Sequence, residues 1–115
     1  MTKHSKYYNI KSLVDGIQFD SKKEAARYGE LKLLERAGEI SELQVQPSFN
    51  LMVNDQLICK YIADFSYLIE DKKYPGVYAT IVEDVKGCKK GCAWEKFRIK
   101  AKLMKAIHDI DVVVI

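Results

Sequence analysis

Residues 79–87 read ATIVEDVKG, an apolar segment that closes on two acids, a lysine and a glycine. The β-branched residues predict a strand over residues 79–86, which Gly87 ends. Side chains alternate between the two faces of a strand, so Asp84 and Lys86 are expected on one face and Glu83 on the other. The rest of the predicted sheet is built around this segment.

The preceding apolar segment, residues 58–69, is predicted to be one long strand because its aromatic residues alternate with their neighbours. Asp64 lies in its interior, where a bare carboxylate is unfavourable unless it is paired or bound to a metal. If the two strands pair, Asp64 can lie on the face that carries Asp84 and Lys86.

Periodic apolar residues on either side of these strands predict an α/β fold. Ser21 and Glu24 have the spacing of a capping box and Gly38 suits a left-handed stop, so a helix is expected from there to about residue 37. The other expected elements are a hairpin at 14–17, extended segments at 43–46 and 49–53, a helix at 93–109 and a strand at 112–115. The last strand needs the second helix as a crossover, which indicates a mixed central sheet flanked by helices.

Length and composition are those of one ordinary domain. The 115 residues, 48% of them apolar, can bury a single core. Residues 1–12 are polar and basic, so a flexible segment is expected ahead of one domain over residues 13–115. No membrane span or secretory signal is recognisable, which predicts a cytoplasmic protein without a membrane partner. Three cysteines (Cys59, Cys88 and Cys92) suggest neither a disulfide framework nor a complete zinc site.

Basic residues gather in the C-terminal third. Residues 86–105 hold eight Lys or Arg and one acid, whereas residues 12–85 hold eight bases and thirteen acids. This distribution suits a polyanion held beside a metal site. Candidate contacts are Lys89 and Lys90 after the strand, and Lys96 and Lys100 one helical turn apart. The last two fall within the apolar arc of the helix, so they can equally be snorkelling side chains that only cover the core.

Two carboxylates and a lysine on one sheet face are the groups that hydrolysis of a phosphodiester requires. Asp64 and Asp84 would supply oxygen ligands for Mg²⁺, for which Mn²⁺ can substitute. The metal would polarise the phosphoryl oxygen and activate a water. Lys86 would orient that water or neutralise charge that develops on the phosphate.

The pattern of Asp64 followed by Asp84-Val85-Lys86 resembles the signature of the PD-(D/E)XK nuclease superfamily, which implies a restriction-endonuclease-like αβββαβ core. The chain also resembles a family of small phage proteins classed as a domain of unknown function, and its layout is similar to that of phage endonuclease I, a Holliday-junction resolvase, and of the endonuclease subunit of some transposons. The segments that carry this resemblance are DGIQFDSKKEA at 15–25, LKLL at 31–34, QP at 46–47, YIADF at 61–65 and EDVKG at 83–87.

Residue by residue, the resemblance implies that Glu24 is the acid of the first helix, Asp64 the central metal ligand, Asp84 the second acid and Lys86 the catalytic lysine. Val85 would offer its backbone carbonyl to the metal, and Gln46, which matches a glutamine of related nucleases, would be a DNA contact. Ala63 stands where the signature usually has proline, and Asp84 where glutamate is commoner. The implied substrate is DNA, branched rather than of fixed sequence, and a homodimer would cut both strands.

Several alternatives remain open from the residues. Glu24 can be a capping residue only. Glu30 is then a second candidate for the acid of the first helix, provided that its side chain is buried. Arg27, three residues before it, can pair with Glu30 instead. The chain can also be a silent DNA-binding protein of the same fold, a nuclease subunit that needs a partner protein, or an interaction module whose basic helix binds an acidic protein.

Overall fold

The computed structural model describes residues 12–115. A four-stranded sheet at its centre has the order β3-β6-β7-β8. Its strands are β3 (Ser41–Val45), β6 (Phe65–Glu70), β7 (Tyr78–Asp84) and β8 (Val112–Val114). The pairs β3–β6 and β6–β7 are antiparallel, whereas β8 runs parallel to β7. The predicted flexible segment 1–12 lies outside the described residues except for Ser12, which opens a strand.

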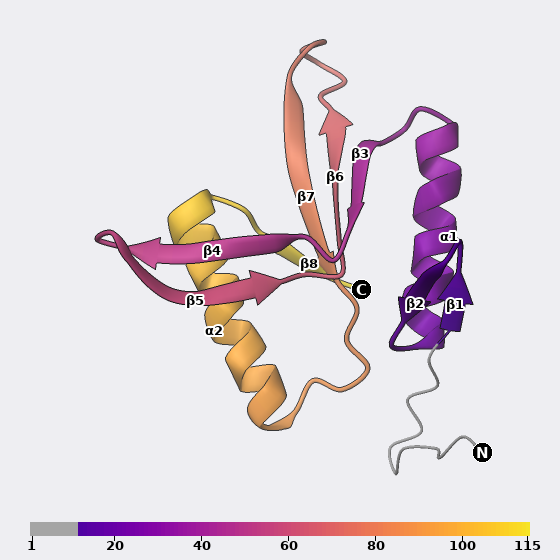
Figure 1. The fold of residues 1–115 in the computed structure, drawn as a ribbon. Coiled ribbons are helices and arrows are strands. Elements are labelled where there is room, and N and C mark those ends of the chain that lie inside the picture. The colour runs from indigo at the N-terminus through magenta and orange to yellow at the C-terminus, as the bar shows by residue number, and fades with distance from the viewer. Residues whose placement is uncertain (1–11) are drawn as a thin grey trace, which may run out of the picture.

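Two helices complete the predicted core (Figure 1). Helix α1 (Lys22–Arg36) precedes the sheet, and helix α2 (Gly91–His108) makes the crossover from β7 to β8. The expected α/β fold with a mixed sheet is confirmed, in the order α, three strands, α, strand. Between β3 and β6 the chain inserts a hairpin of β4 (Ser48–Val53) and β5 (Gln56–Ile62), which we call the arm.

The single strand predicted over residues 58–69 is wrong, because β5 ends at Ile62 and β6 begins at Phe65. The break between β5 and β6 lies beside a bend between β3 and β4. At that bend Gln46 has a left-handed backbone (φ 54°) and Pro47 has no N–H to donate to a neighbouring strand. Both bends are tied together: the Gln46 N–H donates to the Asp64 carbonyl at 2.9 Å, and the Ala63 N–H donates to the Pro47 carbonyl at 3.1 Å. Asp64 therefore lies at a corner between the sheet and the arm.

The hairpin and the helix cap predicted near the N-terminal end of the described residues are both present. Strands β1 (Ser12–Val14) and β2 (Ile17–Phe19) form a hairpin whose turn residues Asp15 and Gly16 both have positive φ, as a type I′ turn requires. The Ser21 hydroxyl accepts from the Glu24 N–H at 3.1 Å and caps α1. Gly38, with φ 80°, follows the end of that helix.

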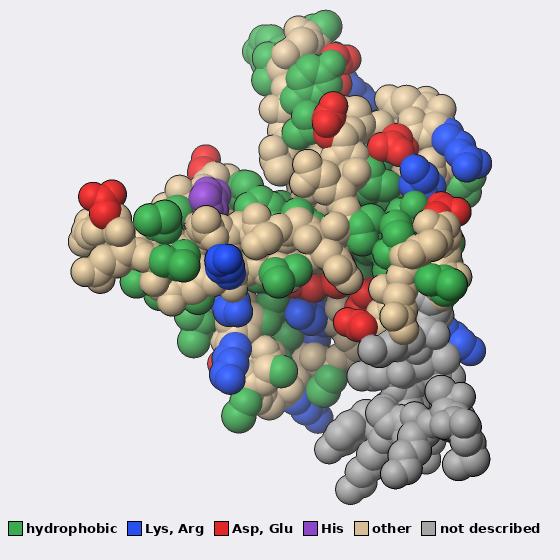
Figure 2. All heavy atoms as spheres, in the orientation of Figure 1, with side chains coloured by type: hydrophobic (Ala, Val, Ile, Leu, Met, Phe, Trp, Pro, Cys, Tyr) green, Lys and Arg blue, Asp and Glu red, His purple; other side chains and the backbone are tan. Residues whose placement is uncertain are grey.

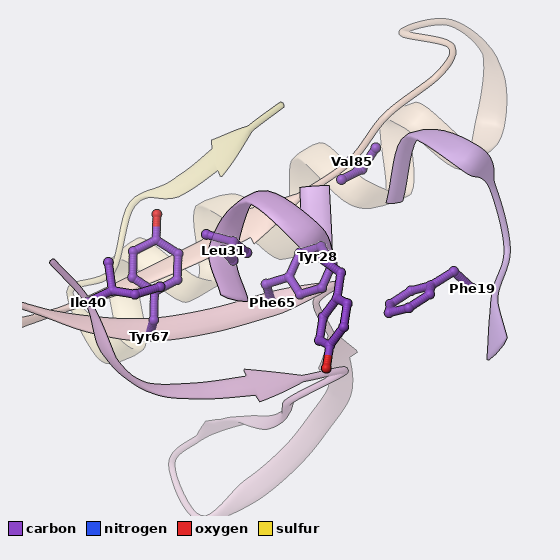
Figure 3. Packing of buried hydrophobic residues seen from close by; sticks show 7 residues of the cluster. All are labelled: Phe19, Tyr28, Leu31, Ile40, Phe65, Tyr67 and Val85. Carbon is purple, nitrogen blue, oxygen red and sulfur yellow. The ribbon is translucent and has the colours of Figure 1, made fainter. Parts of the chain in front are cut away.

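Apolar side chains pack on both faces of the sheet. Under α1, the first cluster joins the sheet to the N-terminal hairpin (Figure 3) and consists of Phe19, Tyr28, Leu31, Ile40, Phe65, Tyr67 and Val85. The second joins α2 to the arm and the sheet and consists of Leu51, Tyr61, Ala63, Val82, Phe97 and Met104. Consecutive residues of β7 thus alternate between the α1 side and the α2 side, which is the alternation that the sequence predicts.

Within residues 12–115, no helix is long and apolar enough to cross a membrane.

Candidate active site

Asp64 and Asp84 meet where β6 begins and β7 ends. The register pairs Phe65 with Glu83, so the next pair along the ladder is Asp64 and Asp84. Two hydrogen bonds from backbone N–H groups fix this corner: the Asp64 N–H donates to the Glu83 carbonyl at 3.2 Å, and the Val85 N–H donates to the side-chain oxygen Asp64 Oδ2 at 2.7 Å. Asp64 is half-buried and Asp84 is buried. Directly opposed residues of an antiparallel pair share a face, so the expected juxtaposition of the two carboxylates is present.

Burial and neighbouring acids raise the pKa of the Asp64 carboxyl group to about 8. Burial is the main cause, followed by the hydrogen bond with Asp84, while the hydrogen bond from the Val85 N–H works in the opposite direction. The negative charges of Asp84 and Glu24 add to the rise. Two carboxylates this close cannot both ionise freely without a cation beside them.

Lys86 is the cation nearest to Asp84. Its ammonium Nζ lies 3.4 Å from Asp84 Oδ1 and 4.3 Å from the centre of the Phe97 ring. The backbone of Lys86 is held at the edge of β8, where its N–H donates to the Ile115 carbonyl. Asp84 and Lys86 therefore do share a face, as the spacing of two predicts.

Tyr61 is a site residue that sequence reasoning missed. Its hydroxyl donates to Asp84 Oδ2, and its ring, only 3% exposed, lies 6.4 Å from the ring of Phe49 and 6.3 Å from that of Phe97. Burial and the neighbouring Asp84 carboxylate raise the pKa of the phenol, so it stays a donor. The two oxygens of Asp84 thus face Tyr61 and Lys86 separately. In the sequence, Tyr61 is one more aromatic residue of an apolar strand, with no signal that separates it from the core.

Glu24 lies near the two aspartates at the start of α1. Burial and the charge of Asp20 raise the pKa of its carboxyl group, and the charge of Asp84 contributes as well, whereas Lys86 lowers it. Its N–H is capped by Ser21, which accounts for one half of the expected capping box. The charges of Asp84 and Lys86 both act on the Glu24 carboxyl group, so Glu24 stays a candidate for the rim of the same site.

A magnesium ion suits this donor set only if waters supply most of its ligands. No group of three or more His, Cys, Asp or Glu side chains within residues 12–115 is arranged as a metal cluster. Asp64 and Asp84 offer two carboxylates, and the Val85 carbonyl accepts no hydrogen bond from the described residues. Magnesium commonly binds through one or two carboxylates and keeps several waters, so the residues fit it.

Glu83 faces away from this site, as predicted, and takes part in a separate ion pair. Arg27 donates to both of its carboxylate oxygens, at 2.7 and 2.6 Å, and the Tyr67 hydroxyl donates to Oε2. The two-pronged bond to Glu83 raises the pKa of Arg27, and burial raises that of Tyr67 to about 12. Arg27 also bonds Glu30 at 2.8 Å, and the Glu30 side chain is 63% exposed, so the structure has the pairing with Arg27 and not the burial that would make Glu30 a rival of Glu24.

A cleft of about 340 Å³ opens beside Asp84 and Lys86, between β5 and α2. Lys96 and Lys100 line it, together with Lys60 from the arm, which sequence reasoning did not single out. Lys89 and Lys90 are exposed in the segment before α2 and do not line it, and Gln46 is exposed at the bend that contacts Asp64. In Figure 2, acidic side chains gather at the centre of the visible face, with lysine and arginine side chains below them and over α2.

A larger cavity, about 380 Å³, lies on the sheet between β3 and the start of the arm. None of the four expected catalytic residues lines it, and it has no lysine or arginine in its wall. Two of those four residues, Asp84 and Lys86, line the smaller cleft, so we place the candidate site there.

The chain belongs to a family described as a protein of unknown function (DUF1064), whose model matches residues 4–113. No curated protein and no solved structure matches the chain. Membership of this family assigns no activity, so the function has to be argued from the site.

Proposed function

We propose that this member of a family of unknown function is a Mg²⁺-dependent DNA endonuclease of the PD-(D/E)XK type. The observation that carries the proposal is the juxtaposition of Asp64, Asp84 and Lys86, of which Asp84 and Lys86 line a cleft together with three further lysines. Paired acids can hold the metal ion that assists hydrolysis of a phosphodiester, and an adjacent lysine can stabilise the charge that develops on the phosphate.

In the proposed reaction, the residues of the site have different roles. Asp64 and Asp84 would bind the metal, with the Val85 carbonyl beside them and Glu24 at the rim, acting through water. When bound, Mg²⁺ supplies a Lewis acid for the phosphoryl oxygen and lowers the pKa of a coordinated water. Lys86 orients the attacking water and neutralises charge on the phosphate, which its position 3.4 Å from Asp84 allows.

DNA is the proposed substrate because the cleft beside the acids is cationic. Lys96 and Lys100 line it, and Lys89 and Lys90 extend the basic surface along the chain. Lysine contacts to phosphates position a strand but carry no sequence information, so a chain this small favours DNA structure over sequence. We therefore propose branched DNA, similar to a Holliday junction, in phage recombination or processing within the host cytoplasm.

Residues 12–115 hold one candidate site, so two cuts in a duplex or junction would need two chains. A symmetric homodimer is the simplest assembly that supplies them. A nuclease subunit that cuts only with a partner protein is the second candidate, and a catalytically silent DNA-binding protein of the same fold is the third.

Cleavage assays test the proposal. The purified protein is incubated with four-way-junction, flap and linear duplex DNA, with and without Mg²⁺, beside Asp84→Asn and Lys86→Ala. Exposed residues elsewhere supply matched controls, Asp71→Asn and Lys102→Ala. We expect Mg²⁺-dependent cuts, most on branched DNA, that both site variants abolish and both controls retain. Cleavage that survives both site variants overturns the assignment, binding without cleavage favours the silent protein, and cleavage only after a cell extract is added favours the partner-dependent subunit.

A further inference from the structure

The cleft beside Asp84 has two walls of different origin. One is the last part of β5, with Lys60 and Ile62, and the other is the start of α2, with Lys96 and Lys100. The rings of Tyr61 and Phe97 lie at its base, and Asp84 and Lys86 close one end. A ligand in the cleft therefore lies against the candidate catalytic groups.

Three of the cations around the cleft have no internal partner. Lys60, Lys96 and Lys100 make no ion pair with any described residue, whereas Lys105 pairs with Asp109 and Asp111. Unpaired ammonium groups around one concavity favour the binding of an anion there. Two of these groups lie one helical turn apart, which suits the repeated phosphate charges of a nucleic-acid strand.

The cleft also offers apolar surface, which a double helix does not use. Ile62 is 62% exposed at its rim, and Ala93 is exposed on the opposite wall. The bases of a duplex are stacked and paired, so only their edges and the phosphates reach a protein. An unpaired nucleotide can instead lay its base on an apolar wall while its phosphates meet the lysines.

We propose that the cleft between the arm and α2 binds a nucleotide of an unpaired DNA strand and guides that strand to Asp84 and Lys86. Its volume, about 340 Å³, is near the lower end of the range of small-ligand pockets and suits one nucleotide rather than a duplex. If the chain is a nuclease, as proposed above, cleavage is expected in a single-stranded or frayed segment of a branched substrate; this part of the inference rests on the proposed function.

Fluorescence anisotropy in EDTA, which prevents metal-dependent cleavage, tests binding apart from activity. The probes are a labelled oligothymidine and a labelled hairpin duplex of the same strand length. We expect Ile62→Ala to weaken binding of the single strand roughly fivefold and to leave duplex binding unchanged, because only an unpaired base reaches that wall. Met52→Ala, which removes a similarly exposed side chain from β4, is the matched control.

The lysines are tested by salt dependence on the same single-stranded probe. Lys60→Ala and Lys96→Ala are each expected to lower the slope of log affinity against log salt by about 0.7, the value for one phosphate contact on a single strand. Lys102→Ala, exposed on α2 but outside the cleft, is expected to leave the slope unchanged. All these side chains are exposed, and thermal melts verify that each variant is folded.

Two results overturn the inference. One is equal weakening of single strand and duplex by Ile62→Ala, or none for either probe, and the other is a salt slope that Lys102→Ala changes as much as Lys60→Ala does. If the single strand binds as expected but no DNA is cut, the cleft remains a single-strand site and the proposed nuclease activity falls. If duplex DNA is cut without any preference for the single strand, the activity stands and this inference falls.

Discussion

Two buried tyrosines make the same bond to consecutive acids on opposite sides of β7. Tyr61 donates to Asp84 and Tyr67 donates to Glu83. We expect Tyr61→Phe to raise the Mg²⁺ concentration needed for half-maximal cleavage about tenfold, because the second contact of a metal ligand fixes its orientation. The Mg²⁺-induced rise in melting temperature should shrink in parallel, which is a measurement independent of activity.

Tyr67→Phe is the control for that prediction, since it also removes one hydroxyl from a buried ring. It should lower the free energy of unfolding by about 1.5–3 kcal/mol, the loss of a hydrogen bond to a charged group, and leave the Mg²⁺ dependence unchanged. Equal Mg²⁺ dependence in both variants would show that Tyr61 only packs.

The Asp64 carboxylate that would bind the metal is expected to destabilise the folded chain when no metal is bound. Its pKa is about 8 in the folded chain and near 4 when unfolded, so folding takes up a proton between these values. The protonated carboxyl therefore favours the folded state fully below pH 4, and this contribution is lost as the pH rises to about 8. In metal-free buffer, Asp64→Asn should melt a few degrees above the parent at pH 8 and close to it at pH 4. A parent whose stability does not fall over this interval contradicts the assigned pKa.

At the scale of elements, the sequence predicted what local signals determine. Helix α1 begins after Ser21 and ends before Gly38 because a cap and a left-handed glycine act within one turn. The break between β5 and β6 escaped prediction, because the side-chain alternation continues through Asp64 and the bend depends on Pro47, far away in sequence.

The same distinction separates the site residues. Asp84 and Lys86 follow from the period of a single strand, and Asp64 from the pairing of two neighbouring ones. Lys60 and Tyr61 become site residues only because the arm folds back onto α2, a contact between elements that no spacing in the sequence encodes. Residues contributed by inserted hairpins are therefore the ones that sequence reasoning is most prone to miss.

Across the whole molecule, the sheet separates a stabilising face from a reactive one. Glu83 is 1% exposed and is paired with Arg27 under α1, whereas its neighbour Asp84 faces the cleft. Glu83→Gln leaves the Arg27 charge without its main counter-ion, so we expect a loss of about 3 kcal/mol in the free energy of unfolding. Asp84→Asn also removes the repulsion between Asp84 and Asp64, so it should lower the free energy of unfolding less than Glu83→Gln does, and it should abolish cleavage. Urea unfolding followed by circular dichroism measures the first effect, and the DNA assay measures the second. If Asp84→Asn unfolds the protein as strongly as Glu83→Gln does, Asp84 is part of the structural core, and the separation of the two faces that places the catalytic site beside α2 is wrong.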